Sequence, residues 1–176
     1  DISGNTFENN SYGIVVGFTG ADQSSVIVTD NVFTGNDTGI SSNQTTPITL
    51  GAGNTFTNNG HNLDGDFDGD VPPIQSRYVE TTGDDANFCS DPALPCATVQ
   101  RAVDIAGNGE TIHVGDGTFA GQVIVDGKSV SIEGEGRNVT TITPPATQMA
   151  VTHVNPNSGG NIRGIVAVNN GGELNV

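Results

Sequence analysis

The chain has 176 residues and a formal net charge of −15, with 20 acidic and five basic side chains. This charge excludes nucleic acid as a partner, because phosphates need basic side chains, and it disfavours anionic membranes. Leucine occurs four times and tryptophan never, which excludes a large helical core. No stretch approaches the roughly 18 apolar residues of a membrane-spanning helix, so we expect no membrane insertion in this segment.

The first 63 residues repeat one phrase three times. Each copy reads Asn-x-Phe-x-x-Asn, and the copies begin at Asn5, Asn31 and Asn54, 26 and then 23 residues apart. The first two copies continue with x-x-Gly-Ile, and the third with x-x-Asn-Leu. A period of this length predicts a solenoid, in which each unit buries its apolar face against its neighbours. Apolar residues at strand spacing predict that the coils consist of short strands.

The recurring side chains have a physical reason to recur. In a coil of strands, equivalent positions stack about 4.8 Å apart along the axis. A stacked asparagine can therefore donate to one neighbouring copy and accept from the other. Phe7, Phe33 and Phe56 are expected to form an internal aromatic column, in which each ring pair adds about 0.5–1.5 kcal/mol beyond area burial.

The pattern stops after Leu63, and residues 64–77 read as an acidic linker that contains two adjacent prolines. This segment carries a candidate calcium site formed by four carboxylates at alternate positions: Asp64, Asp66, Asp68 and Asp70. They resemble the first half of an EF-hand loop, although Gln75 stands where that loop has a bidentate glutamate. A solvated linker without a metal is the alternative, and the sequence leaves both open.

Two features point to an exported protein. Cys89 and Cys96 are the only cysteines, and a disulfide between them would stabilise the loop by about 2–3 kcal/mol, with two free thiols as the alternative. Four Asn-x-Ser/Thr sequons are candidate glycosylation sites: Asn9, Asn36, Asn43 and Asn138. Asn36 also occupies a ladder position, where a glycan would clash if the side chain points inward.

A new pattern begins at Tyr78. Thr98 can cap a short helix that runs through Ala106, with apolar residues on one face and Gly107 as its stop. Further strands are predicted at 111–114, 123–125, 129–132 and 149–152, each bounded by turn residues. We interpret these strands as new coils of the same kind of solenoid.

Three runs carry a resemblance to a known family: residues 95–104 (PCATVQRAVD), 109–119 (GETIHVGDGTF) and 128–136 (KSVSIEGEG). They resemble the opening of a pectin-lyase-like right-handed parallel β-helix, and the Asn-x-Phe phrases resemble the β-helix repeats of that superfamily. The resemblance implies an all-β, right-handed parallel β-helix. It also implies that residues 98–106 form a capping helix over the first coil, whose backbone groups would otherwise be unpaired.

The domain organisation follows from these patterns. We expect residues 1–63 to be the C-terminal coils of one β-helix, 64–77 the linker, and 78–176 the capped N-terminal coils of the next. If a second copy followed residue 176, Gly164-Ile165-Val166 would precede the next Gly13-Ile14-Val15 by 25 residues, within the observed period. This continuity predicts a tandem array of copies joined head to tail, with a fragment of a larger protein as the alternative.

The superfamily includes lyases and hydrolases of acidic polysaccharides, so catalysis must be tested. Arg137 and Arg163 are candidate bases of a lyase, but no acidic cluster shares their predicted coils. Asp84-Asp85 is the only Asp-Asp pair, and it precedes the capping helix instead of lying on a coil face. Two carboxylates at a defined separation are therefore missing, and we predict that the chain is not an enzyme.

These observations predict an extracellular or cell-surface structural protein that forms a fibre or stalk, which Ca²⁺ would stiffen if the acidic linker binds it. Its expected partners are copies of itself, in the same chain or in neighbouring subunits. A carbohydrate-binding adhesin is the first alternative, with glycans as the ligand and Tyr12 and Tyr78 as the aromatic residues left outside the column. A polysaccharide lyase or hydrolase is the second alternative. His113 reads as a packing or turn residue.

Overall fold

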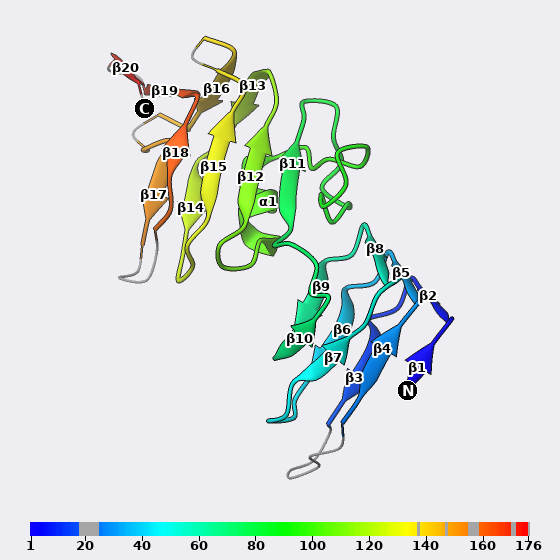
Figure 1. Ribbon diagram of the computed structural model, residues 1–176. Helices are drawn as coiled ribbons and strands as arrows, with labels where there is room; N and C mark the ends of the chain where they lie inside the picture. Colours follow the sequence, from blue (N-terminus) through cyan, green and yellow to red (C-terminus); the bar gives the residue numbers. More distant parts are fainter. Residues whose placement is uncertain (18–24, 137, 147, 155–158, 170–171, 176) are drawn as a thin grey trace. The chain divides into compact units, whose positions relative to one another are not determined.

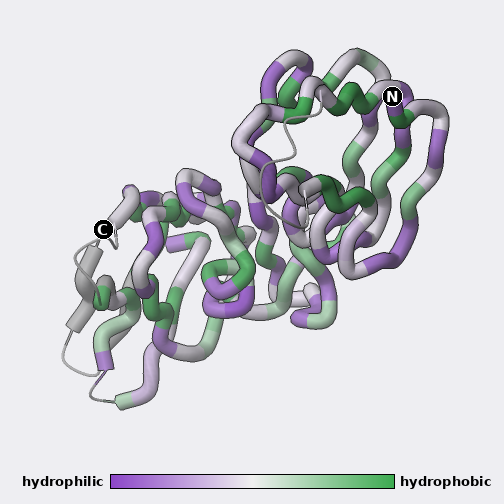
Figure 2. The backbone as a smooth tube through the Cα atoms, turned by 90° about the horizontal axis from the view of Figure 1, so that it is seen from below, coloured by the Kyte–Doolittle hydropathy of each residue, from purple (hydrophilic) through white to green (hydrophobic). Residues whose placement is uncertain are grey.

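The computed structural model describes residues 1–17, 25–136, 138–146, 148–154, 159–169 and 172–175, and these residues form an all-β parallel solenoid with one short helix (Figure 1). The chain divides into two compact units, Asp1–Pro73 and Ile74–Val176, which we call unit 1 and unit 2. Hydrophobic and hydrophilic stretches, drawn in green and purple, both occur within each unit (Figure 2).

In unit 1, the described strands form three sheets, in the orders β1-β4-β7-β10, β2-β5-β8 and β3-β6-β9, and all their pairings are parallel. The strands are β1 (Ile2–Ser3), β2 (Thr6–Glu8), β3 (Tyr12–Val16), β4 (Ile27–Thr29), β5 (Val32–Thr34), β6 (Thr38–Ser42), β7 (Ile48–Leu50), β8 (Thr55–Thr57), β9 (His61–Asp64) and β10 (Phe67–Gly69). Each of three coils contributes one strand to each sheet, and β10 adds a fourth strand to the first sheet, which is the winding of a parallel β-helix.

The register of unit 1 follows the repeated phrase. Phe7 pairs with Phe33, and Phe33 with Phe56, on adjacent strands. On the next strand of each coil, Ile14 pairs with Ile40, and Ile40 with Leu63. These residues belong to the apolar core of unit 1, in which Phe33 and Ile40 are fully buried. The predicted parallel stacking is confirmed.

The glycine of the phrase is required by close packing between coils. A Cβ at Gly13 would lie 2.5 Å from the backbone oxygen of Gly39, and a Cβ at Gly39 would lie 2.7 Å from the backbone oxygen of Asn62. Both distances are too short for a methyl group. The third copy has Asn62 at this position on β9, which is the last described strand of its sheet. The glycine is therefore replaced in the copy that has no further described strand stacked on it.

In unit 2, the described strands form the sheets β11-β12-β15-β18, β13-β16-β19-β20 and β14-β17. The elements are β11 (Ser76–Val79), α1 (Val99–Ile105), β12 (Thr111–Val114), β13 (Gly117–Ala120), β14 (Val123–Val125), β15 (Ser131–Gly134), β16 (Thr140–Thr143), β17 (Val151–His153), β18 (Ile162–Arg163), β19 (Ile165–Asn169) and β20 (Gly172–Asn175). All pairings between these strands are parallel except that of β20, which is antiparallel to β19.

The predicted capping helix is present as α1. Thr98 is its N-cap, and its hydroxyl accepts a hydrogen bond from the amide of Arg101. Val99, Ala102 and Val103 are buried, and the helix ends before Ala106, which is also buried. These side chains belong to a second apolar core, which also includes Ile112 and Ile132 of the sheet strands.

Several sequence-based boundaries differ from the structure. Residues 64–77 were expected to be a linker, but β10 lies inside this range, pairs with β7 and continues the winding, and β11 begins at Ser76. The strands predicted at 129–132 and 149–152 begin two residues later, as β15 and β17, and β13 and β16 were not predicted. The last described strand, β20, pairs antiparallel with β19 and so departs from the parallel winding.

Candidate functional site

Two amide ladders run through unit 1 and connect its coils. The backbone amide and Nδ2 of Asn5 both donate to Oδ1 of Asn31, at 2.9 and 3.1 Å. The same pair of donors in Asn10 reaches Oδ1 of Asn36 at 3.0 and 3.2 Å. The pattern is repeated one coil further on, from Asn31 to Asn54 and from Asn36 to Asn59. Each ladder therefore has one direction, and every step uses one side-chain oxygen as the acceptor for two donors.

The phenylalanine column lies beside these ladders. The ring centroids of Phe7 and Phe33 are 5.1 Å apart, and those of Phe33 and Phe56 are 4.8 Å apart, with interplanar angles of 10° and 8°. The predicted aromatic stack is confirmed. Because these side chains hold the coils together, they form the scaffold of unit 1, and the middle members Asn31, Phe33 and Asn36 are fully buried.

The amide ladder excludes glycosylation at one of the four sequons. Asn36 is fully buried, and its Nδ2 donates to the backbone oxygen of Phe7 at 2.9 Å as well as to Asn59. Both hydrogens of this amide are used, so a glycan on Asn36 is incompatible with the folded coil. Asn9, Asn43 and Asn138 are exposed, and glycosylation at these three positions stays a prediction.

The acidic run is spread over the end of unit 1. Asp64 is the last residue of β9 and accepts a hydrogen bond from the hydroxyl of Ser41, whereas Asp66, Asp68 and Asp70 are exposed on or beside β10. Within the described residues, no group of three or more histidine, cysteine, aspartate or glutamate side chains is placed to hold a metal ion. The structure does not gather the four aspartates into a ready-made site, and calcium binding stays a prediction.

The disulfide loop covers the edge of β11 in unit 2. Cys89 and Cys96 are joined, and both are fully buried. The amide of Tyr78 donates to the carbonyl of Cys89 at 2.8 Å, and the amide of Cys96 donates to the carbonyl of Tyr78 at 2.9 Å. The amide of Glu80 donates to the carbonyl of Cys96 at 3.0 Å. The loop thus acts as a surrogate strand that satisfies the backbone groups of the first coil.

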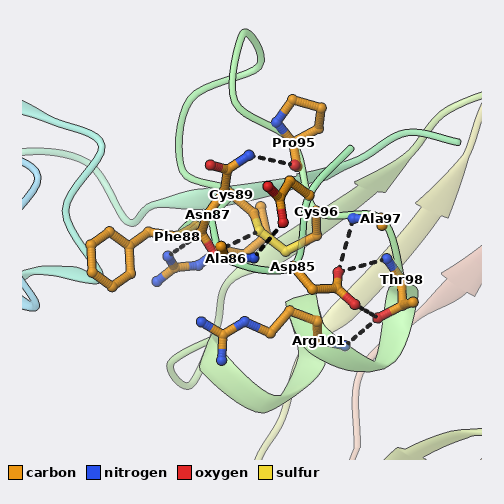
Figure 3. The surroundings of a disulfide bond; sticks show 12 residues. Asp85, Ala86, Asn87, Phe88, Cys89, Pro95, Cys96, Ala97, Thr98 and Arg101 are labelled. Atoms are coloured by element: carbon orange, nitrogen blue, oxygen red, sulfur yellow. Dashed lines mark hydrogen bonds between the residues drawn. A yellow bond between two sulfur atoms is a disulfide. The ribbon is translucent and has the colours of Figure 1, made fainter. Parts of the chain in front are cut away.

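A carboxylate ties this loop to the helix (Figure 3). Oδ1 of Asp85 accepts hydrogen bonds from the amides of Ala97 and Thr98, both at 2.9 Å, and its Oδ2 accepts the hydroxyl of Thr98 at 2.8 Å. Asp85 therefore caps α1 together with Thr98. At the other end of α1, Nζ of Lys128 donates to the carbonyls of Val103, Asp104 and Ala106, at 2.9–3.1 Å.

A buried ion pair completes the capped end of unit 2. Nε and Nη2 of Arg77 donate to the two carboxylate oxygens of Glu110 at 2.6 and 3.0 Å, and Nη1 donates to the carbonyl of Phe88 at 2.8 Å. Arg77 is fully buried although its strand neighbours at this position are isoleucines. This pair was not predicted, because the alternation of β11 indicates an inward side chain at residue 77 but not its partner 33 positions later.

One sheet face of unit 2 carries a row of polar side chains. Tyr78 pairs in register with His113, His113 with Glu133, and Glu133 with Arg163, one residue per coil. The rings of Tyr78 and His113 stack with centroids 5.3 Å apart. Nη2 of Arg163 lies 2.5 Å from Oε1 of Glu133, and this hydrogen bond, together with the charge of Glu133, raises the pKa of Arg163 above its ordinary value.

This row brings together residues that no shared sequence pattern connects. Tyr78 was an unassigned aromatic, His113 a packing residue, and Arg163 a candidate base, whereas Glu133 was not considered. The strand spacings of 35, 20 and 30 residues are too uneven to reveal the row from the sequence. The other candidate base, Arg137, lies outside the described residues.

The comparison with protein families gives one match. Residues 1–83 match the family model of NosD, which is described as a periplasmic copper-binding protein. The match covers unit 1 and β11, which is less than half of the chain. No curated protein and no solved structure matches the chain. This similarity and the stacked coils agree with the expected resemblance to parallel β-helix proteins and support an exported β-helix protein.

The described residues contain no helix that is long and apolar enough to cross a membrane.

Proposed function

We propose that this chain is a structural part of an exported surface fibre or stalk, in which copies follow one another head to tail. The proposal rests on what the repeated residues of unit 1 do. The repeated asparagines and phenylalanines bond coil to coil along the axis, from Asn5 to Asn54 and from Phe7 to Phe56. A repeat that is used for axial cohesion lengthens a protein without creating a catalytic site.

Catalysis is not part of this proposal. The only Asp-Asp pair contributes Asp85 to the cap of α1, and the guanidinium of Arg163 is paired with Glu133. Copper binding, which the description of NosD names, does not fit the described residues either. Both cysteines are in the disulfide, and the described histidine, cysteine and carboxylate side chains include no group of three that could hold a metal.

The intact mass and shape of the native protein test the structural role. We expect a species well above the 18.0 kDa of this chain, or an assembly of such chains, that appears as an elongated particle in electron micrographs. Its length should grow by about 4.8 Å for each coil added. A single compact particle of about 18 kDa would contradict the proposal.

An activity assay tests the absence of catalysis. The protein is incubated with polygalacturonate, pectate and alginate, and new unsaturated or reducing ends are measured. We expect none above the level of a heat-denatured control. Sustained turnover would replace the structural role with that of a polysaccharide lyase or hydrolase.

A further inference from the structure

The sheet β11-β12-β15-β18 carries one polar or aromatic side chain per coil on one face. We call it the polar face, and its central row is Tyr78, His113, Glu133 and Arg163. The Tyr78 hydroxyl and the His113 imidazole make no hydrogen bond to another described side chain or backbone group. Side chains that offer polar atoms to solvent at each coil are what a ligand-binding surface requires.

Carboxylates dominate the charge of this face. Glu133 lies next to His113 in the register, and Glu80 follows β11 directly. Gly115 leaves room for Glu80, because a Cβ at Gly115 would lie 2.3 Å from its carboxylate. Glu135 follows β15 and is exposed. The guanidinium of Arg163, the only one among the described residues of this face, is already paired with Glu133. An anionic ligand is therefore repelled, both locally and by the net charge of −15, whereas a cationic ligand is attracted.

The hydroxyl groups and rings of this face favour a ligand that offers hydroxyl groups and apolar surface as well as positive charge. Ser76, Thr111 and Ser131 form a parallel row two residues before the central one and are half-buried. They can donate to and accept from ligand hydroxyls. The stacked rings of Tyr78 and His113 combine an apolar surface with polar tips, which suits the C–H and O–H groups of a sugar. A ligand with amines alone would leave these groups unused.

The spacing of the rows fits a polymer. Adjacent coils repeat the same polar positions about every 4.8 Å along the axis. This distance is close to the length of one pyranose ring with its linkage oxygen, so a linear oligosaccharide that lies along the axis would place successive sugars over successive coils.

We propose that the polar face of unit 2 binds a linear oligomer of amino sugars, whose protonated amines meet Glu80 and Glu133 and whose rings lie over Tyr78 and His113. This site goes beyond the structural role and does not depend on it. The ligand class also differs from the acidic polysaccharides, which the charge of the chain disfavours.

Isothermal titration calorimetry with a fully deacetylated chitosan hexamer tests the site, at low salt and at a pH where the amines are protonated. We expect one hexamer per chain, with affinity that falls as salt is added. Glu133→Gln should weaken binding about tenfold, because it removes a carboxylate and leaves the Arg163 guanidinium unpaired. Arg163→Ala should strengthen binding several-fold, because it frees Glu133. A loss of folding would weaken binding in both variants, so the tighter binding expected for Arg163→Ala cannot come from it.

Three controls make the test decisive. Glu8→Gln is the matched variant, because it removes an exposed strand carboxylate from unit 1, and it should leave the affinity unchanged. The fully N-acetylated hexamer has the same length without the amines and should bind at least about tenfold more weakly. Spermine supplies amines without sugar rings. Equal losses in Glu8→Gln and Glu133→Gln, equal binding of the acetylated hexamer, or binding of spermine as tight as that of chitosan would each overturn the proposal.

Discussion

Asn36 joins three coils of unit 1 through one short side chain. Its Oδ1 accepts two hydrogen bonds from Asn10, and its Nδ2 donates to Asn59 and to the carbonyl of Phe7. A fully buried amide that satisfies all its groups in this way fixes the turn of its own coil and the register with both neighbours. Because buried backbone amides need acceptors, the same residue type is required again at each coil.

Replacement of this amide is the prediction at the scale of single residues. Asn36→Ala leaves the backbone amide of Asn10 and the carbonyl of Phe7 without their partners in a partly buried turn. We expect the free energy of unfolding to fall by roughly 2–4 kcal/mol, measured by urea denaturation. Asn43→Ala is the matched control, since Asn43 is exposed, and it should change stability by less than about 0.5 kcal/mol. Equal losses in both variants would show that the ladder contributes nothing specific.

The fold of unit 1 could be predicted from the sequence because its repeated side chains contact the equivalent side chains of neighbouring coils. Asn5, Asn31 and Asn54 recur at the spacing of the coils, so the pattern of the phrase is also the register of the sheets. Asn36 was ambiguous as a sequon, because the same three letters describe a glycan acceptor and a ladder position. Only burial separates the two.

The loop between β11 and α1 protects a sheet edge without forming a strand of its own. Its two cysteines are held beside β11 by backbone hydrogen bonds to Tyr78 and Glu80, and the carbonyl of Phe88 is held by Arg77. The disulfide closes this loop, so the surrogate strand is covalently fixed in place. Side-chain amides extend the cover, because Gln100 of α1 accepts from the amide and donates to the carbonyl of Ile124 on β14.

Removal of the disulfide tests this element. We expect Cys89→Ala/Cys96→Ala to lower the free energy of unfolding by about 2–3 kcal/mol, because a short loop regains its freedom in the unfolded chain. Hydrogen exchange should become faster at the amides of Tyr78 and Glu80, which donate into the loop, while the amide of Ile132, which donates to Asn161 in the body of the sheet, serves as the control. Unchanged exchange at Tyr78 would mean that the loop covers the edge without its cross-link.

Sequence reasoning predicted the cap and missed much of what surrounds it. Thr98 and the apolar face of α1 are local signals, and both are confirmed. The pairing of Arg77 with Glu110 and the row from Tyr78 to Arg163 depend on coil lengths that vary with each loop of unit 2. Without an even period, no local pattern shows which residues meet.

Both units wind as parallel coils, but different contacts hold their coils together. In unit 1, repeated side chains bond to their equivalents in the next coil, as Phe7, Phe33 and Phe56 do. In unit 2, the described coils rest on an aliphatic core and on a capped first strand, and the exterior of one sheet is left with polar groups. Within the described chain, cohesion is thus concentrated in the interior of the coils, which leaves the sheet faces available for contacts with other molecules.

The parallel, in-register stacking of coils can be tested most directly with pairs of cysteines introduced on the exposed face of the sheet β2-β5-β8. Val32 and Thr55 are register partners on adjacent strands, so Val32→Cys/Thr55→Cys places two Cα atoms about 4.8 Å apart, within disulfide range. Thr6→Cys/Thr55→Cys spans two coils, about 9.6 Å, which is beyond that range. After mild oxidation and proteolysis, mass spectrometry should find the bond in the first variant and not in the second. A bond in the second variant alone, or in neither, would contradict the stacked β-helix.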